Sequence, residues 1–200
     1  MHNLLPMRLF LMSRHGESTL NVEGRVNGDP LVHVDLTEEG RASARALGVQ
    51  IANVPIGVCI HTRFARTRQT AELALEGREI PFETELLLDD VDVGDLEGET
   101  IGDYRAWKRE HTRADAFPGG ESLDDAARRY AEAYRKLVER DTPGVVLTVV
   151  HEISLRYALN AAAGSDDLDG PMHDIRNATP YLFDEPALRR AAERIGQLAG

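Results

Sequence analysis

Three apolar runs of the sequence each end in residues that could bind or attack a phosphate. The runs cover residues 9–12, 57–60 and 145–150, and the polar residues that follow them include Arg14, His15, Thr62, Arg63 and His151. A neutral imidazole can act as a nucleophile, and a guanidinium group binds phosphate oxygens through a planar fork of donors. Arg14 and His15 therefore predict a phosphoryl-transfer site in which His15 attacks the phosphorus.

The elements that must position these residues can be read from the same pattern. Short apolar runs rich in β-forming residues alternate with longer segments of helical periodicity, which is typical of an α/β domain with a largely parallel sheet. We expect helices from Thr37 through Ile51, from about Phe64 to Gly77, over 122–140, over 155–163 and over 186–198, and a late strand over 181–183. Ligands bind beyond the carboxyl ends of the strands in such sheets, so the three polar ends should converge on one pocket.

No repeat or linker divides the 200 residues, so we expect a single domain over 1–200. The polar stretch 94–120, which holds Trp107, Pro118 and a Gly119-Gly120 pair, should be inserted over the sheet edge as a substrate lid.

Composition limits the partners and the location of the protein. The net charge of −11 opposes contact with nucleic acid and with anionic membranes, so any basic site must be local. Residues 1–7 carry no recognisable export signal, so a cytoplasmic location is expected. Cys59 lies inside an apolar run and should be a buried hydrophobe. Whether the chain forms a homodimer stays open.

The stretch 11–18, followed by Asn21, resembles the Arg-His-Gly signature of the histidine phosphatase superfamily, also called the phosphoglycerate mutase-like family. The stretch 62–71 is similar to the family's Ser-x-x-x-Arg-Ala-x-Gln-Thr-Ala block and aligns Arg66 with its phosphate-binding arginine. His151 matches a histidine that hydrogen-bonds the transferring phosphate. The resemblance implies a three-layer sandwich, with helices on both faces of a mostly parallel sheet.

The resemblance also implies a set of site residues. The catalytic residues would be His15, Asp90 and His151, and the phosphate would be bound by Arg14, Gly16, Asn21, Thr62 and Arg66. No metal and no cofactor are expected, because the arginines supply the positive charge that phosphoryl transfer needs.

The general acid is assigned by its spacing from a glycine-rich block. Relatives often carry a glutamate four residues before a Gly-x-x-Glu-Gly block, which here is 94–98, so that Asp90 occupies the position. Asp89, Asp92 and Glu97 remain open alternatives. We expect neighbouring carboxylates to raise one another's pKa, which would help an acid to hold its proton near neutrality.

The sequence departs from the family after His151, where relatives usually carry glycine and this chain carries Glu152. A carboxylate beside the phosphate would repel it, so we expect Glu152 to point outward or to form an ion pair.

The function implied by the resemblance is that of a metal-independent phosphomonoesterase of the histidine acid phosphatase type. It would act on small phosphorylated metabolites through a phosphohistidine. A cofactor-dependent phosphoglycerate mutase is an alternative; the short chain, the aspartate at the acid position and an insertion with few cations beyond Arg105, Lys108 and Arg109 oppose it. A noncatalytic regulatory protein that binds a phospholigand is a second alternative.

Overall fold

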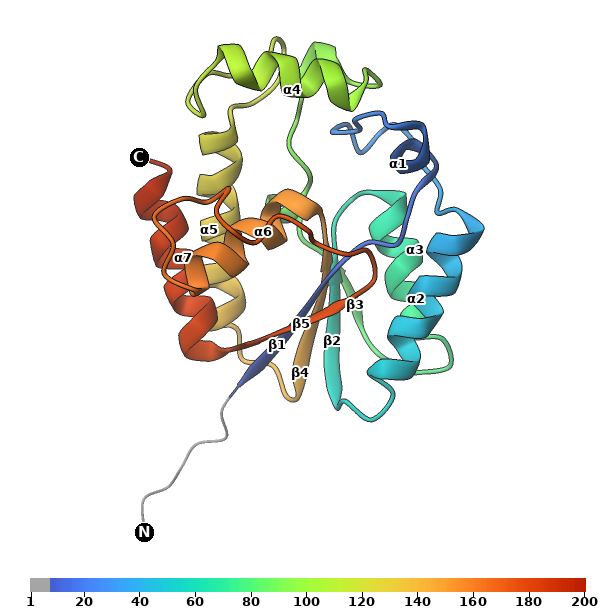
Figure 1. Ribbon diagram of the computed structural model, residues 1–200. Coiled ribbons are helices and arrows are strands. Elements are labelled where there is room, and N and C mark those ends of the chain that lie inside the picture. Colours follow the sequence, from blue (N-terminus) through green and yellow to red (C-terminus); the bar gives the residue numbers. More distant parts are fainter. Residues whose placement is uncertain (1–7) are drawn as a thin grey trace.

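A five-stranded sheet forms the centre of the computed structural model, which describes residues 8–200 (Figure 1). The strands are β1 (Leu9–Arg14), β2 (Ile56–His61), β3 (Phe82–Thr84), β4 (Val145–Val150) and β5 (Pro180–Asp184), in the order β3-β2-β4-β1-β5. The first four pair in parallel and β5 pairs antiparallel with β1. The predicted mostly parallel sheet is confirmed. The segment 1–7, from which no export signal was read, lies outside the described residues.

Helices cover both faces of this sheet (Figure 1). The α-helices are α1 (Thr19–Glu23), α2 (Glu38–Gln50), α3 (Ala65–Ala74), α4 (Ile101–Glu110), α5 (Leu123–Glu139), α6 (Glu152–Ala162) and α7 (Glu185–Leu198), and the 3-10 helices are η1 (Leu86–Leu88) and η2 (Gly94–Leu96). On one face α2 and α3 pack over a core that includes Leu11 and Leu147, and on the other α5, α6 and α7 pack over Phe10 and Met12. The three-layer arrangement is therefore confirmed.

Side-chain alternation explains how one sheet supplies two cores. Successive side chains of a strand point to opposite faces, so Phe10 and Met12 enter one core while Leu11 enters the other. All six residues of β4 are buried, because this strand lies at the centre of the sheet and has helices on both sides.

Two predicted helix starts are confirmed. The hydroxyls of Thr37 and Ser122 accept hydrogen bonds from the first turns of α2 and α5. The buried face of α2 carries Ala44 and Leu47, whereas the other alanines of the helix are exposed.

Helix α6 begins at Glu152, three residues earlier than predicted, with His151 as its extended N-cap residue. Strand β4 therefore passes into a helix without an intervening loop. Glu152 lies in the first helical turn, where the helix dipole favours a negative charge.

The stretch 94–120 contains η2 and α4, and α4 lies above the carboxyl ends of the parallel strands (Figure 1). Aromatic contacts hold it together: Phe117 packs against Tyr104 and Trp107, with ring centroids 5.5 and 4.2 Å apart. Hydrophobic periodicity alone did not predict a helix here, because none of the residues of α4 is fully buried.

Two findings concern the compositional predictions. Among the described helices, none has the length and apolar character needed to cross a bilayer. Cys59 is fully buried in β2, as predicted, and burial raises the pKa of its thiol to about 12.

Candidate active site

The predicted nucleophile, His15, follows the last residue of β1 and is almost completely buried. Its Nδ1 lies 2.7 Å from the carbonyl oxygen of Gly16, and its Nε2 accepts a hydrogen bond of 3.1 Å from Nε of Arg66. A proton on Nδ1 and a free lone pair on Nε2 satisfy both contacts. Burial, reinforced by the positive charges of Arg66 and Arg14, lowers the pKa of His15 well below 6.5. The ring is therefore a neutral imidazole held in one orientation.

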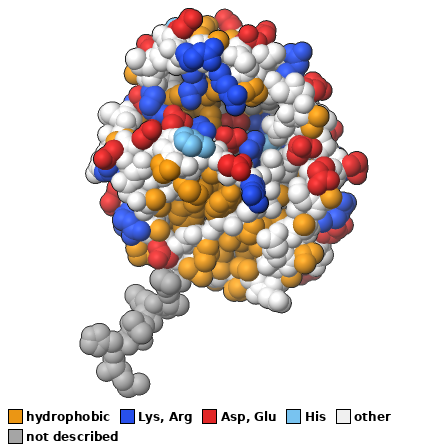
Figure 2. Space-filling model, in the orientation of Figure 1, with side chains coloured by type: hydrophobic (Ala, Val, Ile, Leu, Met, Phe, Trp, Pro, Cys, Tyr) orange, Lys and Arg blue, Asp and Glu red, His pale blue; other side chains and the backbone are white. Residues whose placement is uncertain are grey.

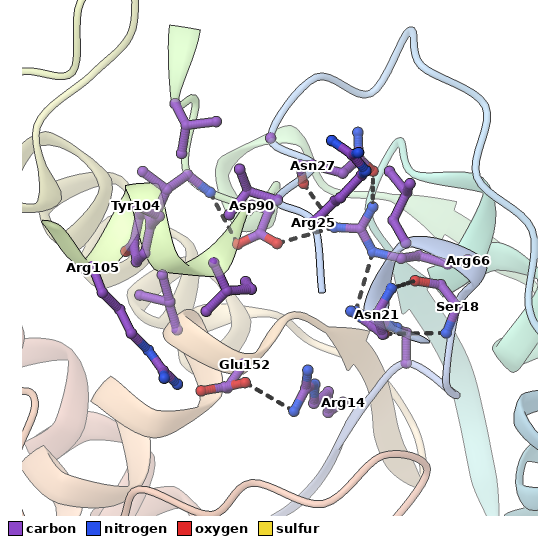
Figure 3. A pocket seen from close by; sticks show the side chains of 18 of the residues that line it. Arg14, Ser18, Asn21, Arg25, Asn27, Arg66, Asp90, Tyr104, Arg105 and Glu152 are labelled. Atoms are coloured by element: carbon purple, nitrogen blue, oxygen red, sulfur yellow. Dashed lines mark hydrogen bonds and ion pairs between the residues drawn. The ribbon is translucent and has the colours of Figure 1, made fainter. Parts of the chain in front are cut away.

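Arg66, in the first turn of α3, connects the groups of the site (Figure 3). Its Nη2 donates to Asp90 Oδ2 at 3.0 Å and to His151 Nδ1 at 3.1 Å, and its Nη1 donates to the side-chain oxygen of Asn27. The guanidinium also stacks on Phe64, with 4.3 Å between its Cζ and the ring centroid. Arg66 thus brings together residues that are up to 136 positions apart in the chain, from His15 to His151.

The second imidazole, His151, is completely buried at the N-terminus of α6. Its Nε2 lies 2.9 Å from the hydroxyl of Thr62, which in turn lies 2.8 Å from the hydroxyl of Thr67. Because Thr67 donates to the Phe64 carbonyl, the chain of hydrogen bonds is satisfied when His151 carries its proton on Nε2. Burial and the charge of Arg66 lower the pKa of His151 well below 6.5.

Asp90 lies between Arg66 and His151, with its Oδ2 3.0 Å from Arg66 Nη2 and 3.3 Å from His151 Nδ1. Burial raises the pKa of this carboxyl above 3.8 and outweighs the opposing effect of Arg66. The expected cause was crowding by other carboxylates. Desolvation is the principal cause instead, and Asp89 is turned away from Asp90 into an ion pair with Arg63.

The three alternative acids occupy other positions. The carboxylate of Asp89 also accepts from the Arg63 amide, that of Asp92 accepts from the Gly94 amide, and that of Glu97 accepts from the amides of Gly28 and Asp29. None of these carboxylates lines the cavity that contains His15, whereas Asp90 does.

A cavity of about 450 Å³ opens above His15. Its wall carries seven cationic side chains and two carboxylates; the cations are Arg14, Arg25, Arg66, Arg105, Lys108, Arg109 and Arg156, and the carboxylates are Asp90 and Glu152. Figure 2 shows Lys and Arg side chains gathered around this hollow. A protein with a net charge of −11 therefore concentrates positive charge at one site, as binding of an anion requires.

Of the five predicted phosphate ligands, Arg14, Asn21 and Arg66 line the cavity, whereas Gly16 and Thr62 do not. Asn21 also completes a capping box with Ser18 at the start of α1. The amide of Gly16 donates to Thr70 Oγ1 at 2.8 Å, and Thr62 is occupied by His151.

Gly16 allows two backbone segments to approach each other closely. A Cβ atom at this position would lie 2.6 Å from the carbonyl oxygen of Gly40, so the glycine permits close packing of two backbone segments. Within the protein Gly16 and Thr62 support the residues around the cavity, and their direct contact with a phosphate stays a prediction.

Glu152 forms the ion pair that was one of its two predicted arrangements. Its Oε2 lies 2.9 Å from Arg14 Nη1, and its Oε1 lies 3.3 Å from Arg156 Nη1. It nevertheless lines the cavity and does not point away from it (Figure 3).

Sequence reasoning missed Asn27, Thr70 and Tyr104 as individual residues of the site. Asn27 lies twelve positions after His15, in the segment that follows α1, and this closeness in sequence to the predicted nucleophile could have identified it. Thr70 and Tyr104 belong to the site through contacts between segments that are distant in sequence, and no local sequence pattern predicts such contacts. In the described residues no group of three or more His, Cys, Asp or Glu side chains is arranged to hold a metal ion.

Comparison with known proteins gives a consistent result. A family model of the histidine phosphatase superfamily (branch 1) matches residues 10–193. A 2,3-bisphosphoglycerate-dependent phosphoglycerate mutase 2 from Gloeobacter violaceus is 36% identical over 195 residues, which cover 90% of this chain and 87% of that protein. A 6-phosphofructo-2-kinase/fructose-2,6-bisphosphatase 4 from Homo sapiens is 30% identical over 190 residues, 88% of this chain and 38% of that protein.

Among solved structures, the alpha-ribazole phosphatase from Shigella flexneri has the same fold, with a TM-score of 0.76 at 23% identity over 87% of this chain and 89% of that one. The family model spans nearly the whole chain, from β1 into α7, and includes each residue that meets Arg66. The chain therefore belongs to the histidine phosphatase superfamily, branch 1.

Proposed function

We propose that this protein is a metal-independent phosphomonoesterase that cleaves small phosphorylated metabolites through a phosphohistidine at His15. The observation that carries the proposal is the state of this imidazole. Its Nδ1–H is held by the Gly16 carbonyl, so the lone pair of Nε2 faces Arg66 at the wall of a cationic cavity. A neutral, oriented nucleophile beside fixed positive charge is what attack on a phosphate ester needs.

In the first step a substrate phosphate binds to Arg14 and Arg66, and Nε2 of His15 attacks the phosphorus. The bond between phosphorus and the ester oxygen breaks, and Asp90 gives its proton to that oxygen, so that an alcohol leaves. In the second step Asp90 takes a proton from water as the water oxygen attacks the phosphohistidine, which releases inorganic phosphate and restores both residues.

The buried partners would hold this machinery in place. His151 bonds to Arg66 through Nδ1 and is itself fixed by Thr62, so we assign to His151 the stabilisation of developing charge together with Arg66. The arginines supply the charge that a metal ion provides in other phosphoryl-transfer enzymes.

We further propose that the stretch 94–120 acts as the lid of a single catalytic domain. Helix α4 contributes Tyr104, Arg105 and Lys108 to the wall of the cavity that His15 and Arg14 also line. The alcohol part of a substrate would therefore contact α4 while its phosphate binds at the strand ends.

The test of the proposed function is hydrolysis of p-nitrophenyl phosphate in the presence of EDTA. We expect steady release of nitrophenol that a chelator does not diminish, since the site draws its charge from arginines. Binding of inorganic phosphate without any turnover would instead support a noncatalytic protein that binds a phospholigand.

A phosphoglycerate mutase is a second candidate, because α4 presents Arg105, Lys108 and Arg109 to the cavity and a mutase is 36% identical to this chain. These cations could hold the second acid group of a bisphosphorylated intermediate. Interconversion of 2- and 3-phosphoglycerate that depends on added 2,3-bisphosphoglycerate would favour this candidate over the phosphomonoesterase.

The two shifted pKa values predict how the rate depends on pH. His15, with its lowered pKa, stays neutral into the acid range, while Asp90, with its raised pKa, donates a proton only below that pKa. For alkyl phosphates, whose leaving groups need a proton, we expect kcat/KM relative to that for aryl phosphates to fall as pH rises through the pKa of Asp90. The ratio is measured because the contribution of His15 cancels in it; a ratio that rises with pH would contradict the assignment.

A further inference from the structure

Glu152 places a negative charge in a wall that is otherwise mostly positive. Its carboxylate bridges Arg14 and Arg156, at 2.9 and 3.3 Å, and its side chain is 35% exposed. Figure 3 shows it beside Arg14, on the side of the cavity opposite Asp90. Both arginines are more than four-fifths buried, so the ion pairs hold the carboxylate in a fixed place.

Two contacts within the protein hold the Arg14 guanidinium in place, and both involve the same nitrogen, Nη1. Its Nη1 meets Glu152 and also donates to the Ile175 carbonyl at 2.9 Å, whereas within residues 8–200 its buried Nε has no hydrogen-bond partner. Because Arg14 lines the cavity, an anion bound there would meet the part of the guanidinium that Glu152 and Ile175 leave free. A phosphate bound to Arg14 would lie roughly 6 to 8 Å from the Glu152 carboxylate, since two contacts of about 3 Å each are separated by the width of the guanidinium group.

This distance gives Glu152 influence over what the substrate carries next to its phosphate. A second anionic group on the carbon that bears the ester oxygen would approach the carboxylate and be repelled. Arg14 and Arg156 would attract it weakly, because Glu152 pairs with both and Asp169 pairs with Arg156 as well. A hydroxyl group in the same place could donate a hydrogen bond to Glu152.

We propose that Glu152 is a specificity-determining residue that favours phosphate esters with hydroxyl groups beside the ester carbon and disfavours those with a carboxylate or phosphate there. The proposal rests on the proposed phosphomonoesterase activity.

The test compares two substrates that differ in one group. Glycerol 2-phosphate carries a hydroxymethyl group where 2-phosphoglycerate carries a carboxylate. We expect the native protein to have the higher kcat/KM for glycerol 2-phosphate. In Glu152→Gln the ratio of the two kcat/KM values should shift by about tenfold toward 2-phosphoglycerate, because a like charge is removed without a change of shape. Glu152→Asp should retain most of the native preference.

The ratio separates specificity from a general loss of activity, since any displacement of Arg14 affects both substrates. The matched control is Glu110→Gln, which removes the same charge from an exposed position of α4 outside the cavity lining and should leave the ratio unchanged. An unchanged ratio in Glu152→Gln, or an equal shift in Glu110→Gln, would overturn the inference while hydrolysis itself persists. If the native protein hydrolyses none of the three compounds (glycerol 2-phosphate, 2-phosphoglycerate and p-nitrophenyl phosphate), the proposed function is overturned and this inference with it.

Discussion

Replacement of His15 by alanine is expected to lower kcat for p-nitrophenyl phosphate by at least about 10⁴-fold. The reason is that the second imidazole of the site, His151, cannot take its place as a nucleophile, because it has no exposed surface and both of its nitrogens are engaged. Water would have to attack the ester directly, without the covalent intermediate that divides the reaction into two easier steps.

The intermediate itself provides the sharper measurement. A phosphate labelled in the substrate should remain on the native protein after rapid denaturation, in a form that acid releases and base does not, and His15→Ala should retain none. His33→Ala is the control, since His33 is an exposed histidine outside the cavity lining and should leave labelling intact. Acid-labile label on the His15 variant would place the nucleophile elsewhere.

The second large effect is expected for Asp90→Asn and depends on the leaving group. An alkoxide leaves poorly without a proton, so hydrolysis of alkyl phosphates should slow by about 10²- to 10³-fold. A nitrophenolate is stable without a proton, so hydrolysis of p-nitrophenyl phosphate should slow by less than about tenfold. The raised pKa of Asp90 and its place on the cavity wall are the reasons for choosing it over its neighbours.

The comparison is made from kcat values for one alkyl and one aryl ester. Asp92→Asn removes a carboxylate two positions away that bonds to the Gly94 amide outside the cavity lining, and it should slow both esters equally or not at all. If Asp90→Asn leaves the alkyl ester unaffected, another group is the acid, and the fall of the alkyl-to-aryl ratio with pH should then persist in this variant.

The ends of the parallel strands were determined by the sequence alone. Short apolar runs rich in β-forming residues precede His15, Thr62 and His151 and favour buried strands, and the carboxyl ends of parallel neighbours lie on one edge of the sheet. Alternation and periodicity are local properties, and for that reason the long amphipathic helix α5 and its Ser122 cap were also predicted correctly.

Tertiary structure decided which partner each polar atom meets. Gly16 and Thr62 stand where the sequence pattern places them, yet Thr70 and His151, which come from other elements, occupy their hydrogen-bonding groups. Glu152 turns into the cavity because Arg14 and Arg156 lie there.

The choice of acid has the same explanation. Asp89 and Asp90 are adjacent and chemically identical, but Arg63 pairs with the first while burial beside Arg66 and His151 raises the pKa of the second. Sequence pattern determines the secondary structure around such residues, whereas desolvation and charge at each oxygen depend on side chains that arrive from distant parts of the chain.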